Sequence, residues 1–427
     1  MKNLLLLSYF FPPHGGGGVL RAVETVRLLE PLGWRSTVVA GPESGYWHTD
    51  ESLLERIPPS AEVLRTGVFN PARIFDAFSR KGREPGKVRS EGAIRRLRKL
   101  ADWLPVPDVY FGWIKPAVSA ARAKVGEVDW IMSTSPPETA HLAAMYLSRR
   151  YGKKWAADFR DPWVSGIYRR FPTPVHESFQ RKLERAVIRR ADLVLASSRE
   201  AVEDFRGRYP GQPPDKFQFL PNGFDSAEFA ALKKDALSAG PLRIIHAGNL
   251  TLGRDISALL EALAALKNEK PCGPAPFQLE LAGPCDSRLR IQAEKLGLAE
   301  EVVFSGYLPR GEILKRLAGS HLALLVESFD PRAALVVPGK LYDYFGAGLP
   351  VLALVPQGAA SRLLERTRAG VMLTSPDRAL VKETLQKFLG RFRAGKPLLG
   401  PPDQAELARY ERASLVGRLA ELLEERG

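Results

Sequence analysis

Four consecutive glycines stand directly after an apolar run at the start of the chain. Gly15 to Gly18 follow His14 and precede a segment with helical spacing. Backbone amides without a Cβ, at the positive end of a helix, suit a phosphate or a sugar that approaches closely. The run is neither GxGxxG nor a Walker loop, which disfavours simple dehydrogenases and NTPases. A flexible turn is the alternative, and Arg21 in the following helix either adds a fixed charge or is only solvated.

A second group of reactive side chains ends another apolar run in the first half of the chain. Asp158, Arg160 and Asp161 occur in the string ADFRDPW, at a strand end of the kind where binding and catalytic groups collect. This much charge at a buried strand end predicts a functional role, with a structural Arg–Asp ion pair as the alternative. His141 lies upstream on a helical segment. It either faces the same site or serves the core, as single histidines on helices usually do.

The second half of the chain repeats the pattern of a strand end followed by polar groups. Gly248 and Asn249 follow an apolar run, and Arg254 precedes an apolar segment of helical spacing. A cation beside free helical amides suits a diphosphate. A solvated arginine in a surface loop would have the same sequence, so both interpretations stay open at this point.

A Gly-Lys turn with an acidic residue follows in the string VPGKLYDYFGAGLPV. It places Gly339, Lys340 and Leu341 at the start of a short helix that also carries Asp343. A carboxylate at Asp343 can accept hydrogen bonds from two adjacent ribose hydroxyls, which a neutral side chain does less well. The string therefore indicates a nucleotide.

Alternating strands and helices must position these groups. In the first half, short apolar runs predict strands, and apolar residues three to four apart predict helices. The expected strands are 4–11, 36–40, 130–133, 155–158 and 193–196, and the expected helices are 20–32, 141–150 and 177–190. Gly33 stands where a helix end favours a positive φ. The alternation predicts a doubly wound parallel sheet.

A second sheet of the same kind is predicted after a polar stretch rich in Ala and Lys. Its strands are expected at 242–247, 277–282, 302–304, 322–326 and 351–354, with helices at 256–266 and 404–425. We therefore expect two Rossmann-like domains, 1–225 and 242–403, with the segment 404–427 packing back towards the first. Ligands of open parallel sheets bind at the carboxyl ends of the strands, so the site is expected in a cleft between the domains.

Composition indicates an ordinary folded protein with anionic partners. The chain has 427 residues, of which 45% are hydrophobic, and 62 Lys and Arg against 48 Asp and Glu give a net charge of +14. This surplus favours phosphates, nucleic acid or an anionic membrane surface. Cys272 and Cys285 lack the spacing of a zinc site, so we expect reduced thiols and no metal. Nucleic acid is not an expected partner, because no recognised binding motif accompanies the charge.

Basic and aromatic residues between 81 and 116 suit a bilayer surface. Cations alternate with apolar residues over 95–105, and three aromatics follow within 109–114. Such a segment can lie on anionic headgroups, although an ordinary helix followed by core aromatics has the same pattern. The sequence has no run of about 18 apolar residues, and its opening lacks a signal-peptide cleavage site. We expect a cytoplasmic protein, with peripheral contact to the inner face of the membrane as an open possibility.

The motifs together resemble the family-4 retaining glycosyltransferases of GT-B fold over nearly the whole chain. The shared motifs, in the family's order, are YFFPP with the glycine run, Ser197 to Glu200, Pro221 to Asp225, Ala247 to Leu250, Leu281 to Pro284, Val302 to Tyr307 and Gly348 to Val351. The strings DFRDPW and PGKLYDY look like the branch that builds bacterial surface polysaccharides and related glycoconjugates. The resemblance implies transfer of a sugar from a nucleotide-diphosphate sugar, with a UDP-sugar as the expected donor, to a polysaccharide, lipid-linked or other glycoconjugate acceptor with retention of configuration.

The resemblance also implies roles for individual residues. Gly16 and Gly17 would lie near the donor phosphates and the acceptor, Arg254 would bind the diphosphate, and Asp343 would bind the ribose. Arg254, Lys340 and backbone amides would neutralise the leaving diphosphate, so neither a divalent ion nor a separate cofactor is expected. Asp161 would position the acceptor or stabilise positive charge on the sugar. The remaining expected donor contacts are Gly248, Asn249, Gly339 and Leu341.

Two positions depart from the family pattern. The first glutamate of the family's Glu-x7-Glu motif falls at Leu335, and the arginine beside Gly248 is replaced by Asn249. Either Glu327 or Asp330 takes the place of the missing carboxylate, or the donor is held differently. Three other functions stay open: a nucleotide-sugar 2-epimerase or a phosphorylase of the same architecture, and an inactive GT-B homologue that only binds nucleotide sugars.

Overall fold

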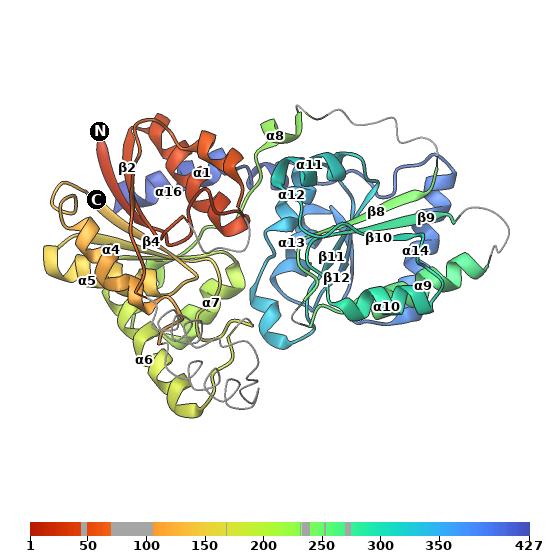
Figure 1. Ribbon diagram of the computed structural model, residues 1–427, viewed down its shortest axis with the longest axis horizontal. Coiled ribbons are helices and arrows are strands. Elements are labelled where there is room, and N and C mark those ends of the chain that lie inside the picture. The colour runs from red at the N-terminus through yellow and green to blue at the C-terminus, as the bar shows by residue number, and fades with distance from the viewer. Residues whose placement is uncertain are drawn as a thin grey trace, which may run out of the picture. The chain divides into compact units, whose positions relative to one another are not determined.

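The chain folds as two units, each built on one parallel sheet (Figure 1). The computed structural model describes residues 1–43, 49–69, 106–167, 169–230, 232, 240–251, 253–269 and 275–427. Unit 1 comprises Met1–Ser197, Ala201–Leu220 and Val416–Gly427, and unit 2 comprises Ser198–Glu200 and Pro221–Leu415. The last twelve residues of the chain thus belong to unit 1, although they follow unit 2 in the sequence.

Unit 1 contains a seven-stranded parallel sheet in the order β3-β2-β1-β4-β5-β6-β7. The strands are β1 Lys2–Leu7, β2 Trp34–Ala40, β3 Glu62–Arg65, β4 Trp130–Ser135, β5 Lys154–Phe159, β6 Leu193–Ala196 and β7 Phe217–Phe219. The helices are α1 Gly17–Leu29, α4 Ile114–Ala121, α5 Thr139–Tyr151, α6 Pro174–Arg190, α7 Arg199–Arg208 and α16 Arg412–Glu425, with short 3-10 helices at Glu30–Leu32, Glu51–Arg56, Phe111–Trp113 and Pro214–Lys216. Because the strand order reverses at β1, right-handed crossovers place helices on both faces of the sheet.

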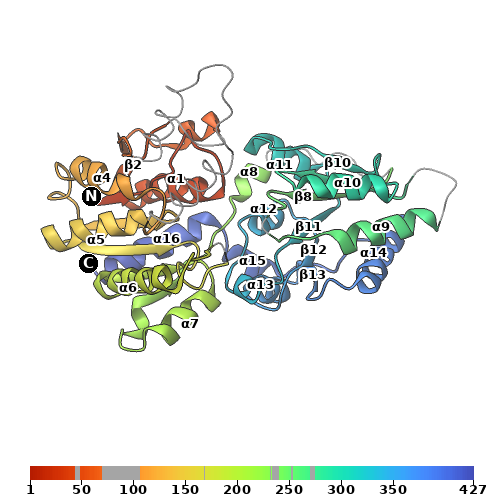
Figure 2. The same cartoon turned by 60° about the horizontal axis from the view of Figure 1, so that its bottom comes forward.

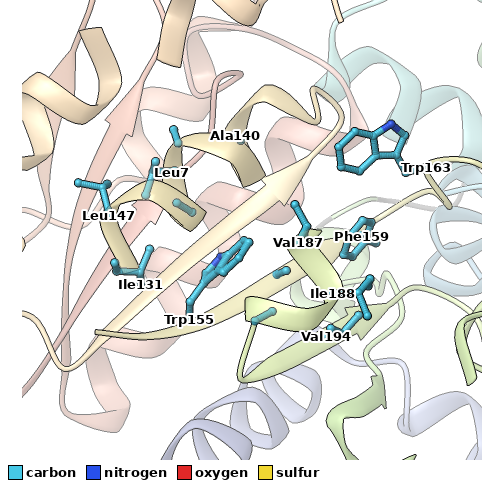
Figure 3. Packing of buried hydrophobic residues seen from close by; sticks show 14 of the residues in the cluster. Leu7, Ile131, Ala140, Leu147, Trp155, Phe159, Trp163, Val187, Ile188 and Val194 are labelled. Carbon is cyan, nitrogen blue, oxygen red and sulfur yellow. The ribbon is translucent and has the colours of Figure 1, made fainter. Parts of the chain in front are cut away.

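The core of unit 1 lies where α5 and α6 pack side by side against the strands (Figures 2 and 3). Ile131 of β4 and Trp155 of β5 meet Leu147 of α5 in this cluster, and all three are fully buried. Trp163, from the string ADFRDPW, is also fully buried, and its indole Nε1 donates to Gln180 Oε1 of α6 at 2.8 Å. The loop after β5 is therefore anchored to the core by its tryptophan.

Helix α16 completes unit 1 from the far end of the chain. Its buried side chains are Val416, Leu419, Ala420, Leu422 and Leu423. Polar contacts tie its last turn to strand starts: Lys2 Nζ lies 2.8 Å from Glu424 Oε1, and Lys154 Nζ donates to the Gly427 carbonyl at 2.9 Å. The C-terminal helix is thus an integral layer of unit 1.

Unit 2 contains a six-stranded parallel sheet in the order β10-β9-β8-β11-β12-β13. The strands are β8 Leu242–Ala247, β9 Phe277–Ala282, β10 Val302–Phe304, β11 Leu322–Val326, β12 Val351–Leu354 and β13 Gly370–Leu373. The helices are α8 Ser226–Ala230, α9 Ser257–Asn268, α10 Ser287–Lys295, α11 Arg310–Ala318, α12 Lys340–Gly346, α13 Ala359–Thr367, α14 Arg378–Arg393 and α15 Gln404–Ala408, with a 3-10 helix at Pro331–Leu335. Helices α9 and α14 pack side by side (Figure 2). The strand order reverses at β8, so the switch point of this sheet lies where β8 and β11 end side by side.

The predicted alternation of strands and helices is confirmed in both units. The bounds predicted for β8 to β12 agree with the structure, whereas the short strands β3, β7 and β13 were not predicted. Gly33 has φ +83 at the end of its helix, as its position indicated. The prediction of one terminal helix over 404–425 is wrong: α15 and α16 are separate, because residues 410 to 412 pair with Phe224, whose amide donates to the Tyr410 carbonyl at 3.0 Å.

Two sequence predictions fall wholly or partly on residues that the structure does not describe. Residues 70–105 contain most of the basic segment expected to contact a membrane, and Cys272 lies within 270–274. Of the described aromatics in that segment, Trp113 is fully buried in the core of unit 1. The Cys285 thiol forms no disulfide. None of the described helices combines the length and the apolar character that crossing a bilayer requires.

Candidate functional site

Two neighbouring strands in unit 2 are each followed directly by a glycine. Gly248 follows β8 with φ +123, and Gly283 follows β9 with φ +150, backbone conformations that residues with a Cβ rarely adopt. A Cβ on Gly283 would overlap the Gly248 carbonyl, and a Cβ on Gly248 would lie 3.4 Å from Cε of Lys340. The two glycines thus allow the strand ends and the Lys340 side chain to pack closely together.

We expect Gly283→Ala to lower the free energy of unfolding by about 1–3 kcal/mol, because it combines a strained φ with a backbone clash. Urea unfolding followed by circular dichroism would measure the loss. Gly297→Ala is the matched control, since Gly297 also has a positive φ of +71 but an added Cβ there would have nothing within 4 Å. Equal losses in the two variants would show that the close approach at Gly248 has no energetic importance.

Lys340, the first residue of α12, contacts the end of β8. Its Nζ lies 3.1 Å from Nε2 of His246, the next-to-last residue of β8. Although Lys340 as a whole is partly exposed, burial of its ammonium, together with the charge of Arg254, lowers its pKa to about 7 against the opposing charge of Glu327. A lysine in this state responds strongly to an anion, because a bound negative charge would stabilise its protonated form.

Arg254 lies in the loop between β8 and α9 and is held by a carboxylate. Its Nε lies 3.1 Å from both carboxylate oxygens of Glu327, and its NH2 lies 3.0 Å from Oε2. Both side chains are nearly buried, with 10% and 6% exposed. The alternative of a solvated surface arginine is therefore wrong. Substitution of Arg254 alone would leave Glu327 buried without this partner, so its effects on binding and folding would be mixed.

The carboxylates near Leu335 are already engaged. Glu327 binds Arg254, and Asp330 caps the 3-10 helix Pro331–Leu335 by accepting from the Arg332 amide at 2.9 Å and pairing with the Arg332 side chain. Leu335 itself is the last residue of this 3-10 helix. In this arrangement neither carboxylate is a vacant substitute for the missing glutamate of the family motif.

Asp343 shares an arginine with a second carboxylate. Arg310, at the start of α11, donates from NH2 to Asp343 Oδ1 at 3.1 Å and from Nε to Glu228 Oε1 of α8 at 3.1 Å. Burial lowers the pKa of Arg310, whereas the two carboxylates raise it, and the net effect is a raised pKa. One Asp343 oxygen is thereby oriented. The other, Oδ2, accepts no hydrogen bond from the residues that the structure describes.

The other predicted donor contacts surround Lys340 and Gly248. Gly339 caps α12 at its amino end, and Asn249 is exposed directly after Gly248. The Leu341 side chain is fully buried and its amide donates to the Pro338 carbonyl at 3.1 Å, so only its backbone could approach a ligand. Their roles as donor contacts stay predictions.

In unit 1 the glycine run forms the amino end of α1. Gly16 and Gly17 are exposed, and Gly16 has φ +105 as the residue that caps the helix. A Cβ on Gly18 would overlap the guanidinium of Arg160, which donates from Nε to the Ser135 carbonyl at 2.8 Å and from NH2 to the Pro136 carbonyl at 2.6 Å. Gly18 is thus explained by packing against Arg160, while Gly16 and Gly17 present backbone to the surface.

The carboxylate of Asp158 forms a structural ion pair. Arg21 Nε donates to its Oδ2 at 3.0 Å, Arg21 NH2 donates to its Oδ1 at 2.7 Å, and Thr134 Oγ1 adds a bond at 3.0 Å. Asp158 is 1% exposed and Arg21 is 10% exposed. The interpretation of Arg21 as a merely solvated residue is therefore wrong, and for Asp158 the structural alternative holds.

Asp161 stands in the same loop as Trp163 and directly after Arg160. Two buried residues of α6 hold this loop, Gln180 through Trp163 and Glu184 through the Val164 amide, whose nitrogen lies 3.0 Å from Oε2. Asp161 is partly buried in this anchored loop. Its role towards an acceptor stays a prediction.

His141 serves the core. Its ring is fully buried 4.4 Å from the Phe159 ring, its Nδ1 lies 2.7 Å from Ser133 Oγ, and burial lowers its pKa to about 3. A neutral, enclosed imidazole of this kind does not act as an exposed base. The possibility that His141 faces a ligand site is therefore not supported.

The predicted site residues form one set in each unit. Unit 1 holds Gly16, Gly17 and Asp161, and unit 2 holds Gly248, Asn249, Arg254, Gly339, Lys340, Leu341 and Asp343. Sequence reasoning missed His246 and Arg310 and gave Glu327 a different task. A histidine inside an apolar strand was the available signal for His246, whereas the pairing of distant residues at Arg310 has no local signature. Within the described ranges, no three His, Cys, Asp or Glu side chains gather as metal ligands would.

Comparison with solved structures shows a shared fold. HepE from Anabaena, solved in complex with UDP-glucose, matches with a TM-score of 0.65 and 18% identity over 100% of both chains. WaaG, a glycosyltransferase involved in lipopolysaccharide biosynthesis, matches with a TM-score of 0.60 and 16% identity over 98% of this chain and 99% of its own. Searches of protein-family models and of curated proteins gave no match. With its two parallel α/β sheets, the chain has the GT-B fold, as the sequence predicted.

The same fold also occurs in a protein described as an isomerising enzyme. The putative UDP-N-acetylglucosamine 2-epimerase from Listeria monocytogenes matches with a TM-score of 0.57 and 13% identity, over 100% of this chain and 96% of its own. The fold alone therefore does not separate a transferase from an epimerase.

Proposed function

We propose that this protein is a glycosyltransferase that moves a sugar from a nucleotide-diphosphate sugar to a polysaccharide, lipid-linked or other glycoconjugate acceptor. The observation that carries the proposal is that two cations lie at the carboxyl ends of the strands of unit 2: Lys340 beside Gly248, and Arg254, whose charge acts on Lys340. This is the part of a parallel sheet where ligands bind, and two cations there suit a diphosphate. UDP-glucose in the solved HepE structure makes a UDP-sugar the first donor to test.

The chemistry follows from the charge that develops on the leaving group. As the bond to the sugar breaks, negative charge grows on the diphosphate, and an ammonium and a guanidinium already in place stabilise it. The sugar carbon becomes oxocarbenium-like, and the acceptor hydroxyl attacks from the same face as its proton passes to the departing phosphate oxygen, so the configuration is retained. With these cations the reaction would need no divalent ion. In unit 1, Gly16, Gly17 and Asp161 would serve the acceptor.

The proposal assigns Asp343 to the ribose of the donor. Arg310 orients one of its oxygens, and Oδ2 would accept from the ribose hydroxyls. We expect Asp343→Ala to weaken binding of UDP about ten- to a hundredfold, as loss of hydrogen bonds to a charged group does. Isothermal titration would measure the change. Glu228→Gln is the matched control, because it removes the other carboxylate of Arg310 and leaves Asp343 in place; an equal loss in both variants would speak against a ribose contact.

A thermal-shift screen with nucleoside diphosphates and their sugars tests the proposed function directly. A ligand that binds only the folded protein raises its melting temperature. We expect a uridine diphosphate compound to do so, and transfer to acceptor glycans is then assayed with the sugar that binds. The absence of a shift with every nucleoside diphosphate would remove the proposal.

The epimerase is the second candidate, favoured by the fold that it shares with the Listeria protein. An epimerase converts UDP-N-acetylglucosamine without an acceptor, whereas a transferase releases UDP in proportion to the acceptor glycosylated. A protein that binds the nucleotide and does neither would be an inactive homologue. Contact with an anionic membrane surface stays a prediction within this proposal.

A further inference from the structure

A buried histidine links Lys340 to the centre of the sheet in unit 2. His246 Nδ1 lies 2.9 Å from the carbonyl oxygen of Leu324 on β11, and its Nε2 lies 3.1 Å from Lys340 Nζ. A carbonyl oxygen only accepts hydrogen bonds, so Nδ1 must carry the ring proton. Nε2 then has a lone pair and accepts from the Lys340 ammonium.

His246 is neutral as well as fixed in one tautomer. It is fully buried, and burial together with the charge of Lys340 holds its pKa well below the usual value. A neutral imidazole does not repel the ammonium that it receives. The carbonyl of Leu324 therefore determines which nitrogen of His246 meets Lys340.

The same carbonyl also holds the helix that carries Lys340. Tyr344 of α12 donates its hydroxyl to the Leu324 carbonyl at 3.1 Å and accepts from the Ala247 amide at 3.0 Å. Lys340 and Tyr344 lie one turn apart on α12. One peptide group of β11 thus anchors both the helix and, through His246, the side-chain end of Lys340.

Charged and titratable groups reach Lys340 from three other segments. The Glu327 carboxylate after β11 favours the ammonium, the Arg254 guanidinium before α9 opposes it, and the Cys285 thiol lies after β9. His246 differs from these groups because it is an uncharged acceptor within hydrogen-bond distance of Nζ. The hydrogen bond from His246 can orient the Lys340 ammonium, whereas the charged groups act on it only through their electrostatic field.

We infer that His246 is a positioning residue that holds the Lys340 ammonium beside Gly248 by accepting its hydrogen bond. The inference rests on the proposed function in one respect, that Lys340 there meets a diphosphate. The alternative is a core histidine whose only task is the bond to Leu324. Two substitutions separate these roles: His246→Asn retains a donor at the Nδ1 position, and His246→Gln retains an acceptor at the Nε2 position.

The pH dependence of Lys340 acylation by acetic anhydride tests the inference without a ligand. Only the neutral amine reacts, so the extent of labelling, measured by peptide mass spectrometry, rises through the pKa of Lys340. In the wild-type protein the midpoint is expected at about pH 7. Loss of the acceptor disfavours the ammonium, so His246→Asn should move the midpoint to lower pH by about one pH unit, and His246→Gln should leave it within a few tenths.

An unchanged midpoint in His246→Asn would overturn the inference. If this variant does not fold, His246→Gln decides alone, because it loses the bond to Leu324 but keeps the acceptor for Lys340. A midpoint lowered by about one pH unit in His246→Gln would contradict the inference. His321→Asn is the control histidine, since it precedes β11 at the opposite end of the strands and accepts from the Arg243 amide at 2.9 Å. Its midpoint should equal that of the wild-type protein.

Titration with UDP provides a second readout and separates this inference from the proposed function. Above the midpoint Lys340 must gain a proton to bind the diphosphate, so His246→Asn should bind UDP about tenfold more weakly than wild type at pH 8 and within about threefold at pH 6. A wild-type protein that binds no nucleoside diphosphate would refute the proposed function, while the labelling experiment would still decide the role of His246. Wild-type binding with no difference in His246→Asn would refute the inference alone.

Discussion

Lys340→Met should lower turnover of the donor sugar about 10²–10³-fold, the largest effect on activity that we expect from a single side chain in unit 2. Methionine retains much of the lysine stem and removes the charge. The lost charge is one that would stabilise the leaving diphosphate as its bond to the sugar breaks. Because the ammonium is held in a crowded site, folding gains little from it, and the free energy of unfolding should change by no more than about 1 kcal/mol. Release of nucleoside diphosphate under saturating donor gives the turnover.

The pH profile identifies Lys340 as the source of this effect. In the unliganded protein the pKa of Lys340 is lowered to about 7, so the ammonium is fully present below that pH and is lost as pH rises through it. The wild-type kcat/KM should therefore fall about tenfold per pH unit above this value, and the variant should lack this decrease. Lys315→Met, at an exposed pair with Glu312 on α11, is the control and should leave both quantities unchanged. A variant that keeps the wild-type pH limb would disprove the assignment.

Arg21→Met should destabilise the protein by about 3–5 kcal/mol, because it leaves the Asp158 carboxylate buried without its partner. Asp158 is almost inaccessible to water, and Thr134 supplies only one further hydrogen bond. Chemical denaturation with urea, followed by tryptophan fluorescence, measures the change. The cost arises from the uncompensated charge and not from a missing contact, and a second substitution can separate the two.

The double variant Arg21→Met with Asp158→Asn removes that charge. We expect it to recover roughly half or more of the lost stability, since a neutral amide is easier to bury than an unpaired carboxylate. Arg181→Met is the surface control: its pair with Glu177 is 52% and 41% exposed, so the loss should stay below about 1 kcal/mol. If the double variant is as unstable as Arg21→Met, the ion pair is not the cause.

Periodicity was sufficient to predict the architecture, because both sheets are buried on two faces. A buried parallel strand such as β11 or β12 consists entirely of apolar residues, and this pattern is visible without tertiary information. The strands that escaped prediction are short and lie towards the sheet edges, where partial exposure weakens the pattern: β13 has three of four residues only partly buried. The break between α15 and α16 depends on Phe224, which is distant in sequence, so local spacing could not reveal it.

The residue types of the candidate site could be predicted from the sequence, but the hydrogen bonds and ion pairs between them largely could not. Gly248, Arg254, Lys340 and Asp343 follow strand ends or begin a helix, positions with local sequence signatures. What a charged residue contacts depends on chain segments far away. Arg21 and Asp158 are 137 residues apart, and this separation explains why the sequence left a charged strand end open to a functional and a structural interpretation.

Unit 1 can be completed only after the whole chain has been synthesised, because part of α16 belongs to it. The ribosome completes the seven strands of that unit long before it reaches Val416–Gly427, the segment that joins unit 1 from the other end of the chain. The nascent first half therefore lacks the buried apolar side chains of α16 while all of unit 2 is made. A nonsense codon near the end of the gene would consequently damage the half of the protein encoded at its beginning.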